Sequence, residues 1–108
     1  MARAFTVVVN TAARSERDAF ILYYAMNYGD GSADRIQTRI DSAITGLDEM
    51  PRRHTRVAYL RDRLFEYRRV LVGKKHRVIY TVDDERRLVE VVRVDLQSND
   101  PASLDDLP

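Results

Sequence analysis

Three apolar runs follow one another between Leu64 and Leu96, and they constrain the fold more than any other part of the chain. The runs are rich in valine, isoleucine, leucine and aromatic residues, which favour β-strands. Two short turn signals separate them, at residues 73–75 and 83–85. Connections this short join only antiparallel neighbours. The stretch therefore predicts a three-stranded antiparallel meander, with strands at about 64–72, 76–82 and 87–95.

The residues before the meander predict one strand and two helices. Phe5–Asn10 is a β-branched run typical of a strand. Helical patterns follow at Ala12–Tyr28 and Ala33–Met50, with glycines between them and Ser32 as the N-cap of the second. A break this short between two amphipathic helices predicts an antiparallel helical hairpin.

The second helix carries the clearest amphipathic pattern in the chain. Its apolar positions recur at the helical period and form one stripe: Ile36, Ile40, Ala43, Ile44, Leu47 and Met50. We expect Ile40, Ile44 and Leu47 to be buried against the sheet.

The order strand, helix, helix, three strands predicts an α+β two-layer domain. The domain is expected to span residues 1–96, with the first strand on either edge of the meander. Residues 97–108 are polar, acidic and interrupted by proline. This composition predicts an acidic, mobile C-terminal tail.

Composition excludes several classes of site. The chain has no cysteine, two histidines and four glycines, and none of them lies in a metal-binding or phosphate-loop motif. We therefore expect no metal and no cofactor. No apolar run approaches the roughly 20 residues that span a bilayer, and the N-terminal run is too short for a signal peptide. These features predict a cytoplasmic protein that does not contact membranes.

Charge is unevenly distributed along the chain. Residues 51–94 hold 13 Lys and Arg against 6 Asp and Glu, a net +7. Residues 95–108 hold 4 acidic and no basic residues, a net −4. The basic half is either an ordinary solvated face or a surface for an acidic partner.

The meander itself carries a row of cations, namely Arg68, Arg69, Lys74, Lys75, Arg77 and Arg93. Strand alternation directs Arg77 away from the helices, and we expect Arg68 to lie beside it on an open face. Two guanidinium groups there could clamp phosphates or carboxylates. The alternative is that both pair with Glu66 and Glu90 as cross-strand ions. Arg69 then falls on the helix-facing side.

Several short segments, in their order along the chain, resemble one protein family. They are Thr11-Ala12-Ala13, Gly29 followed by Ala33, Ile44 through Leu47 to Met50-Pro51, Phe65-Glu66-Tyr67-Arg68, His76-Arg77-Val78-Ile79-Tyr80, and Val91–Val94 followed by Gln97–Asp100. Over residues 5–98 the chain resembles the RelE/ParE superfamily of bacterial toxins from type II toxin–antitoxin systems. The resemblance implies the same α+β fold.

The superfamily holds two activities, and the resemblance bears on both. RelE-like members cut mRNA in the ribosomal A site, whereas ParE-like members inhibit DNA gyrase and are not nucleases. The RelE-type basic positions fall on Arg68, Val70 and Arg77, and no aromatic residue follows Tyr80. RNA cleavage needs a base, an acid and cations. The reduced set favours a ParE-like growth-arresting toxin that is not an enzyme. The alternatives are a RelE-like endoribonuclease using Arg68 and Arg77, and a non-toxic binding module.

The resemblance also implies a cognate antitoxin as partner, with DNA gyrase, or alternatively the ribosome and mRNA, as target. We expect an acidic, amphipathic antitoxin segment to contact the basic half of the chain. The predicted partner-binding residues are Arg68, Lys74, Lys75, Arg77, Arg93, Tyr59 and Leu60. A homodimer or a hetero-oligomer with the antitoxin is compatible with this surface.

Overall fold

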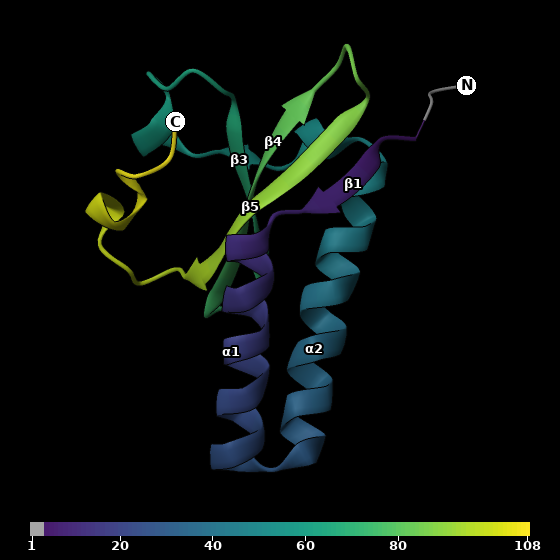
Figure 1. The fold of residues 1–108 in the computed structure, drawn as a ribbon, viewed down its shortest axis with the longest axis vertical. Coiled ribbons are helices and arrows are strands. Elements are labelled where there is room, and N and C mark those ends of the chain that lie inside the picture. The colour runs from purple at the N-terminus through teal and green to yellow at the C-terminus, as the bar shows by residue number, and fades with distance from the viewer. Residues whose placement is uncertain (1–3) are drawn as a thin grey trace.

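The structure, a computed structural model, describes residues 4–108. Residues 1–3 of the predicted domain lie outside the described residues. Two helices, α1 (Thr11–Tyr28) and α2 (Asp30–Thr45), pack against a five-stranded sheet (Figure 1). The strands are β1 (Thr6–Val9), β2 (Thr55–Arg56), β3 (Tyr67–Val72), β4 (His76–Asp83) and β5 (Leu88–Leu96). The predicted α+β fold is confirmed, including the meander and both of its turns.

The sheet has the order β1-β5-β4-β3-β2. β1 pairs with β5 in parallel, from Thr6 opposite Leu88 to Val9 opposite Val91. Parallel neighbours need a long connection, and here the two helices and strands β2 to β4 lie between them in the sequence. The sequence predicted an edge pairing without choosing the edge. It missed β2, which has only two residues and too little alternation to be recognised.

The helix boundaries follow from local chemistry. The side chain of Asn10 accepts a hydrogen bond from the Ala13 amide at 2.8 Å and caps α1. Gly29, at φ +90°, is the only residue between the two helices, so the prediction that α2 starts after Ser32 is wrong. α2 ends at Thr45 rather than Met50, and a 3₁₀ turn continues over Gly46–Asp48. Met50 precedes a proline, a position that disfavours helix.

The core between the helices and the sheet contains the predicted stripe. Ile36, Ile40, Ile44 and Leu47 are buried there, as expected, whereas Met50 is exposed. They pack on alternate residues of the central strands, among them Val78, Tyr80, Val89 and Val91.

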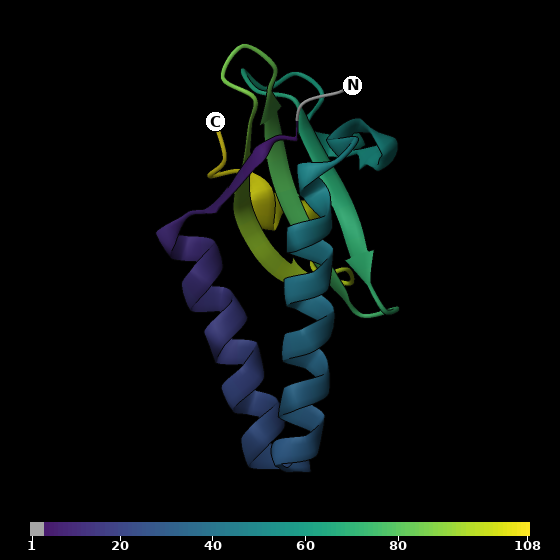
Figure 2. The same ribbon diagram turned by 90° about the vertical axis from the view of Figure 1, so that its right-hand side faces the viewer.

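A second core covers the opposite face of the sheet. Tyr67, Ile79 and Val92 lie under two further 3₁₀ turns, Ala58–Leu60 and Pro101–Leu104, and their flanking residues. The residues supplied by these segments are Val57, Leu60, Leu104 and Leu107. Figure 2 shows the C-terminal segment behind the sheet, with α2 in front. The expected mobile tail is therefore packed on the sheet, and the expected open face is largely covered.

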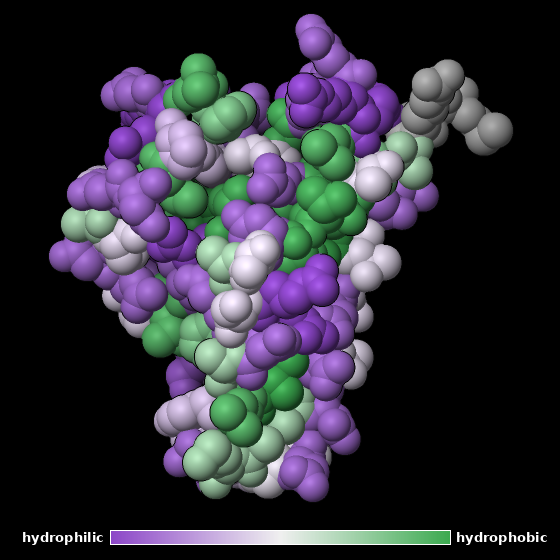
Figure 3. Space-filling model, in the orientation of Figure 1, coloured by the Kyte–Doolittle hydropathy of each residue, from purple (hydrophilic) through white to green (hydrophobic). Residues whose placement is uncertain are grey.

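The helical hairpin extends beyond the sheet (Figures 1 and 2). Its protruding part exposes large apolar side chains, visible at the lower end of the molecule in Figure 3. They include Leu22, Tyr23, Met26 and Tyr28, each more than half exposed. No helix within residues 4–108 is both long and apolar enough to cross a membrane.

Candidate functional site

Arg77 lies on the face of the sheet that points away from the helices, as predicted, but it is buried there. Its Nε and Nη2 donate to the two carboxylate oxygens of Asp95 at 2.6 and 2.9 Å. The two side chains are only 11% and 7% exposed. The guanidinium fork is therefore fully engaged by a directly opposite residue of β5 and is not presented to solvent.

Arg68 lies on the other face, opposite Tyr80 in the β3–β4 ladder. Its Nε donates to Glu66 at 2.7 Å, and its Nη1 donates to the carbonyls of Arg52 and His54 at 3.0 and 2.6 Å. This arginine fastens the connection before β2 to the sheet. The predicted joint clamp of Arg68 and Arg77 is wrong, because the two side chains are on opposite faces.

The faces of β3 are the reverse of those expected from alternation. Val70 and Val72 pack toward the helices, and Tyr67 enters the second core. Arg69 consequently lies on the same side as Tyr67, not on the helix-facing side. Both sides of β3 carry large apolar residues, so hydrophobicity alone gave no basis for choosing between them.

Arg93 is also neutralised inside the chain. It donates to both carboxylate oxygens of Asp106, at 2.8 and 2.9 Å, and to the carbonyl of Ser103 at 2.9 Å. Its Nε lies 3.5 Å from Glu16. The arginine thus ties the acidic C-terminal segment to the sheet and to α1.

Glu16 connects α1 to the unpaired part of β5. Its carboxylate accepts the Val94 amide at 3.0 Å, where β1 has ended and no strand continues on that side. Burial raises the pKa of Glu16, against the lowering effects of this hydrogen bond and of Arg93.

The remaining predicted contact residues divide into exposed and buried groups. Lys74 and Lys75 are exposed in the β3–β4 turn. Tyr59 is half-exposed and its hydroxyl donates to Asp105 at 2.7 Å. Leu60 is 1% exposed and belongs to the second core, so it is unable to contact a partner in this conformation.

The two histidines are held apart in different surroundings. His76 begins β4 and is enclosed by the rings of Phe20, at 4.8 Å between centroids, and Tyr24, at 5.7 Å. His54 lies beside Tyr80, four residues further along β4. His76 and Tyr80 are therefore about 13 Å apart along the strand. In the described part of the chain no three His, Asp or Glu side chains are grouped to hold a metal ion.

Burial lowers the pKa of both histidines below 6.5, helped by Arg53 at His54 and by Lys75 at His76. The unfolded chain binds protons at these histidines more readily than the folded chain does. The contribution of the two neutral rings to folding stability is therefore complete above about pH 6.5, and it is lost as pH falls through the lower folded-state pKa. We expect the NMR chemical shifts of both ring C2 protons to change with pH with midpoints below pH 6.5. A midpoint at or above 6.5 for His76 would contradict its enclosed position.

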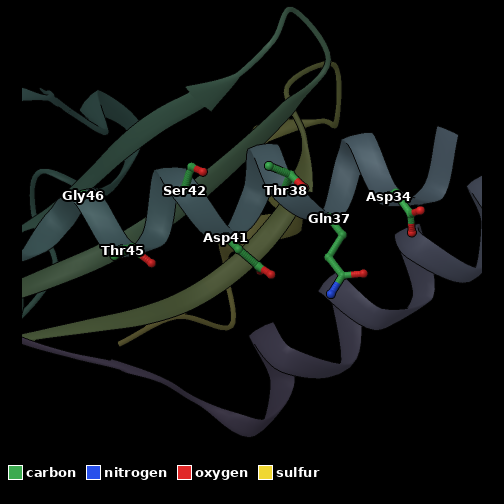
Figure 4. A pocket seen from close by; sticks show the side chains of 7 residues that line it. All are labelled: Asp34, Gln37, Thr38, Asp41, Ser42, Thr45 and Gly46. Carbon is green, nitrogen blue, oxygen red and sulfur yellow. The ribbon is translucent and has the colours of Figure 1, made fainter. Parts of the chain in front are cut away.

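Two hollows border α1 and α2. One, of about 580 Å³, lies between α1 and the ends of β4 and β5 and is lined by Phe20, Tyr23, Tyr24, His76, Val94 and Leu96, among others. The other, of about 730 Å³, is polar, and all of its lining residues belong to α2 and its end (Figure 4). One of them, Asp41, is already bonded to Arg17 by two hydrogen bonds of 2.7 Å.

Sequence reasoning missed the first hollow. At their helical spacing, Tyr23, Tyr24 and Tyr28 are typical of the core and its rim. Only their number on one helix could have indicated an exposed aromatic surface.

Comparisons with known proteins agree with this architecture. In a structure of the chromosomal ParDE TA system from P. aeruginosa, one chain is 12% identical, with a TM-score of 0.70 over 88% of this chain and 98% of that one. A chain of the toxin–antitoxin complex RelBE2 from Mycobacterium tuberculosis is 22% identical, with a TM-score of 0.61 over 92% and 98%. A chain of the archaeal RelE–RelB complex from Pyrococcus horikoshii OT3 is 11% identical, with a TM-score of 0.61 over 90% and 99%.

At these identities the solved structures establish the fold alone. No curated protein sequence matches the chain. The model of one family, the ParE toxin of the type II toxin–antitoxin system parDE, matches residues 7–101. This match spans nearly the whole chain, and the protein therefore belongs to the ParE toxin family of type II toxin–antitoxin systems.

Proposed function

We propose that this protein arrests growth by inhibiting DNA gyrase and is neutralised by a cognate antitoxin. The observation that carries the proposal is the internal engagement of the two arginines that RNA cleavage would use. Arg77 is paired with buried Asp95, and Arg68 is bonded to Glu66 and to two main-chain carbonyls. Neither guanidinium group is available for a scissile phosphate.

The rest of a ribonuclease site is also not assembled. Cleavage of RNA requires a base for the 2′-hydroxyl, an acid for the leaving group and cations for the developing charge. His76 begins β4, whereas His54 lies beside Tyr80, four residues further along that strand. The third RelE-type basic position is Val70. This arrangement supports an inhibitor that acts by binding.

The test compares the two activities directly. The purified protein is added to DNA gyrase with relaxed plasmid, and separately to translating ribosomes whose mRNA is analysed by primer extension. We expect plasmid supercoiling to fall in the first assay and no new mRNA ends in the second.

The alternatives predict other results. New mRNA ends without loss of supercoiling would favour the RelE-like endoribonuclease. If neither assay responds and induced expression leaves growth unchanged, the chain is a binding module on the same fold.

The antitoxin is expected to use the exposed apolar surface of the hairpin and the adjoining hollow. Leu22, Tyr23 and Met26 are exposed on α1, and an amphipathic segment would bury them. Acidic residues in that segment would be steered by the net +7 charge of residues 51–94. Of the predicted contact residues, Lys74, Lys75 and Tyr59 remain exposed for it. Co-expression of the neighbouring antitoxin gene should restore growth.

A further inference from the structure

A basic pocket lies between α2 and the β3–β4 turn. Its volume is about 420 Å³, within the range of sites for small ligands. It is lined by Tyr24, Ser32, Arg35, Ile36, Arg39, Val72, Gly73, Lys74, Lys75 and His76. Four of these residues are cations and none is acidic.

The four cations converge from two separate segments. Arg35 and Arg39 are one turn apart on α2, and Lys74 and Lys75 follow Gly73 in the turn. A Cβ atom placed on Gly73 would lie 4.0 Å from Nη1 of Arg39, so this guanidinium group reaches the turn. Gly73 has φ +63°, which brings the chain round tightly here. Arg35 donates to the hydroxyl of Ser32 at 3.0 Å.

No carboxylate neutralises this cluster. Within residues 4–108 none of the four cations forms a salt bridge, although seven other arginines do: Arg17, Arg52, Arg63, Arg68, Arg77, Arg86 and Arg93. Like charges at positions i and i+4 of a helix destabilise it slightly. Arg35 and Arg39 have this spacing, so folding alone gives no reason for the cluster.

The chemistry of the pocket matches phosphate better than a single carboxylate. Two guanidinium forks and two ammonium groups offer more charge and more donors than one carboxylate can use. Tyr24, Ile36 and Val72 add apolar walls, against which a sugar or a base could lie. All four cations are exposed, so a polymer can pass over them.

We propose that this pocket binds phosphate groups of a nucleic-acid backbone. The site goes beyond the proposed function, and its test contains neither gyrase nor ribosomes. A free nucleotide carries the same phosphate chemistry, and the experiment separates the two sources.

Binding of a fluorescein-labelled DNA duplex is measured by anisotropy over a range of salt concentrations. The test variant is Arg39→Gln with Lys74→Gln. The matched control is Arg14→Gln with Arg56→Gln, which removes two exposed cations that also lack salt bridges in the described residues and so changes the net charge equally. Thermal unfolding checks that both variants are folded.

The wild type should bind DNA with an affinity that falls as salt rises. The test variant should reduce the slope of log affinity against log salt by about 2, because two phosphate contacts are lost. The control should keep the wild-type slope. Equal losses in both variants, or no binding by the wild type, would overturn the proposal.

Competitors identify the ligand. Displacement of the duplex by pyrophosphate or ATP at similar concentrations would support the phosphate site and assign it to free nucleotides. If neither pyrophosphate nor ATP displaces the duplex, and the test variant still binds the duplex more weakly than the wild type, the result would support a nucleic-acid backbone as the ligand. If poly-glutamate binds as tightly as DNA and its binding is weakened equally by the test variant, phosphate recognition is overturned.

Discussion

Replacing Leu47 with alanine should lower the free energy of unfolding by about 2–5 kcal/mol. Leu47 is completely buried in the core between the helices and the sheet. The substitution removes apolar contacts and leaves a cavity that the surrounding strands fill only in part. Domains of this size are stabilised by about 5–15 kcal/mol in total, so a large share of the stability is at risk.

Leu22→Ala is the matched control, because it removes the same atoms from a side chain that is 59% exposed. Its effect should stay within about 0.5 kcal/mol. Urea unfolding of both variants is followed by circular dichroism. The change in the free energy of unfolding is obtained from the shift in the midpoint urea concentration, provided that the dependence of the free energy on urea concentration is unchanged. Equal shifts in the two variants would contradict the assignment of Leu47 to the core.

Replacing Asp95 with alanine should cost about 3–5 kcal/mol, since it leaves the guanidinium group of Arg77 buried without its counter-ion. The ion pair is enclosed and bidentate, with the sheet on one side and the second core beside it. A loss of toxicity in Arg77→Ala would therefore report a weakened fold. Activity of any variant at this position must be compared at equal folded fraction.

The double variant Arg77→Met/Asp95→Leu should recover most of that loss, because well-packed apolar residues can replace a buried ion pair at little net cost. Arg86→Ala provides a surface comparison. Its contact with Asp83 is 3.9 Å long and exposed, and its removal should cost no more than about 1 kcal/mol. If Asp95→Ala is as mild as Arg86→Ala, the pair is solvated rather than buried.

The sequence was sufficient to predict both helices, the first strand, the three strands of the meander and the main core. The turn signals placed both hairpins of the meander, and the stripe of α2 identified Ile40, Ile44 and Leu47 as buried. These signals are local, since each depends on residues within one or two turns of each other.

The register of β4 against β5 and the exposure of the arginines were not predictable in the same way. A bulge in β5 shifts the β4–β5 pairing by one residue between Ile79 and Tyr80. Counted from the turn without the bulge, Arg77 would face Val94; with it, Arg77 faces Asp95. The sequence shows no sign of the extra residue, and so the ion pair and the closure of the supposed open face were missed.

The second core was missed for a related reason. Leu104 and Leu107 lie in a short 3₁₀ turn and its flank, among aspartates. Two leucines in an acidic segment have no helical or strand period that would distinguish a packed segment from a solvated one. Arg93 binds the aspartate next to Leu107 and so ties this segment to the sheet through a contact distant in sequence.

The parallel pairing of β1 with β5 has a consequence for synthesis. β1 has its partner far along the chain, beyond both helices and the first two strands of the meander, from Leu88 to Val91. Until β5 has been made, Thr6–Val9 has no strand to pair with, whereas the helical hairpin can already form from local contacts. Such long-range pairing slows folding compared with a helical domain. The nascent chain therefore cannot complete its sheet before β5 has been made.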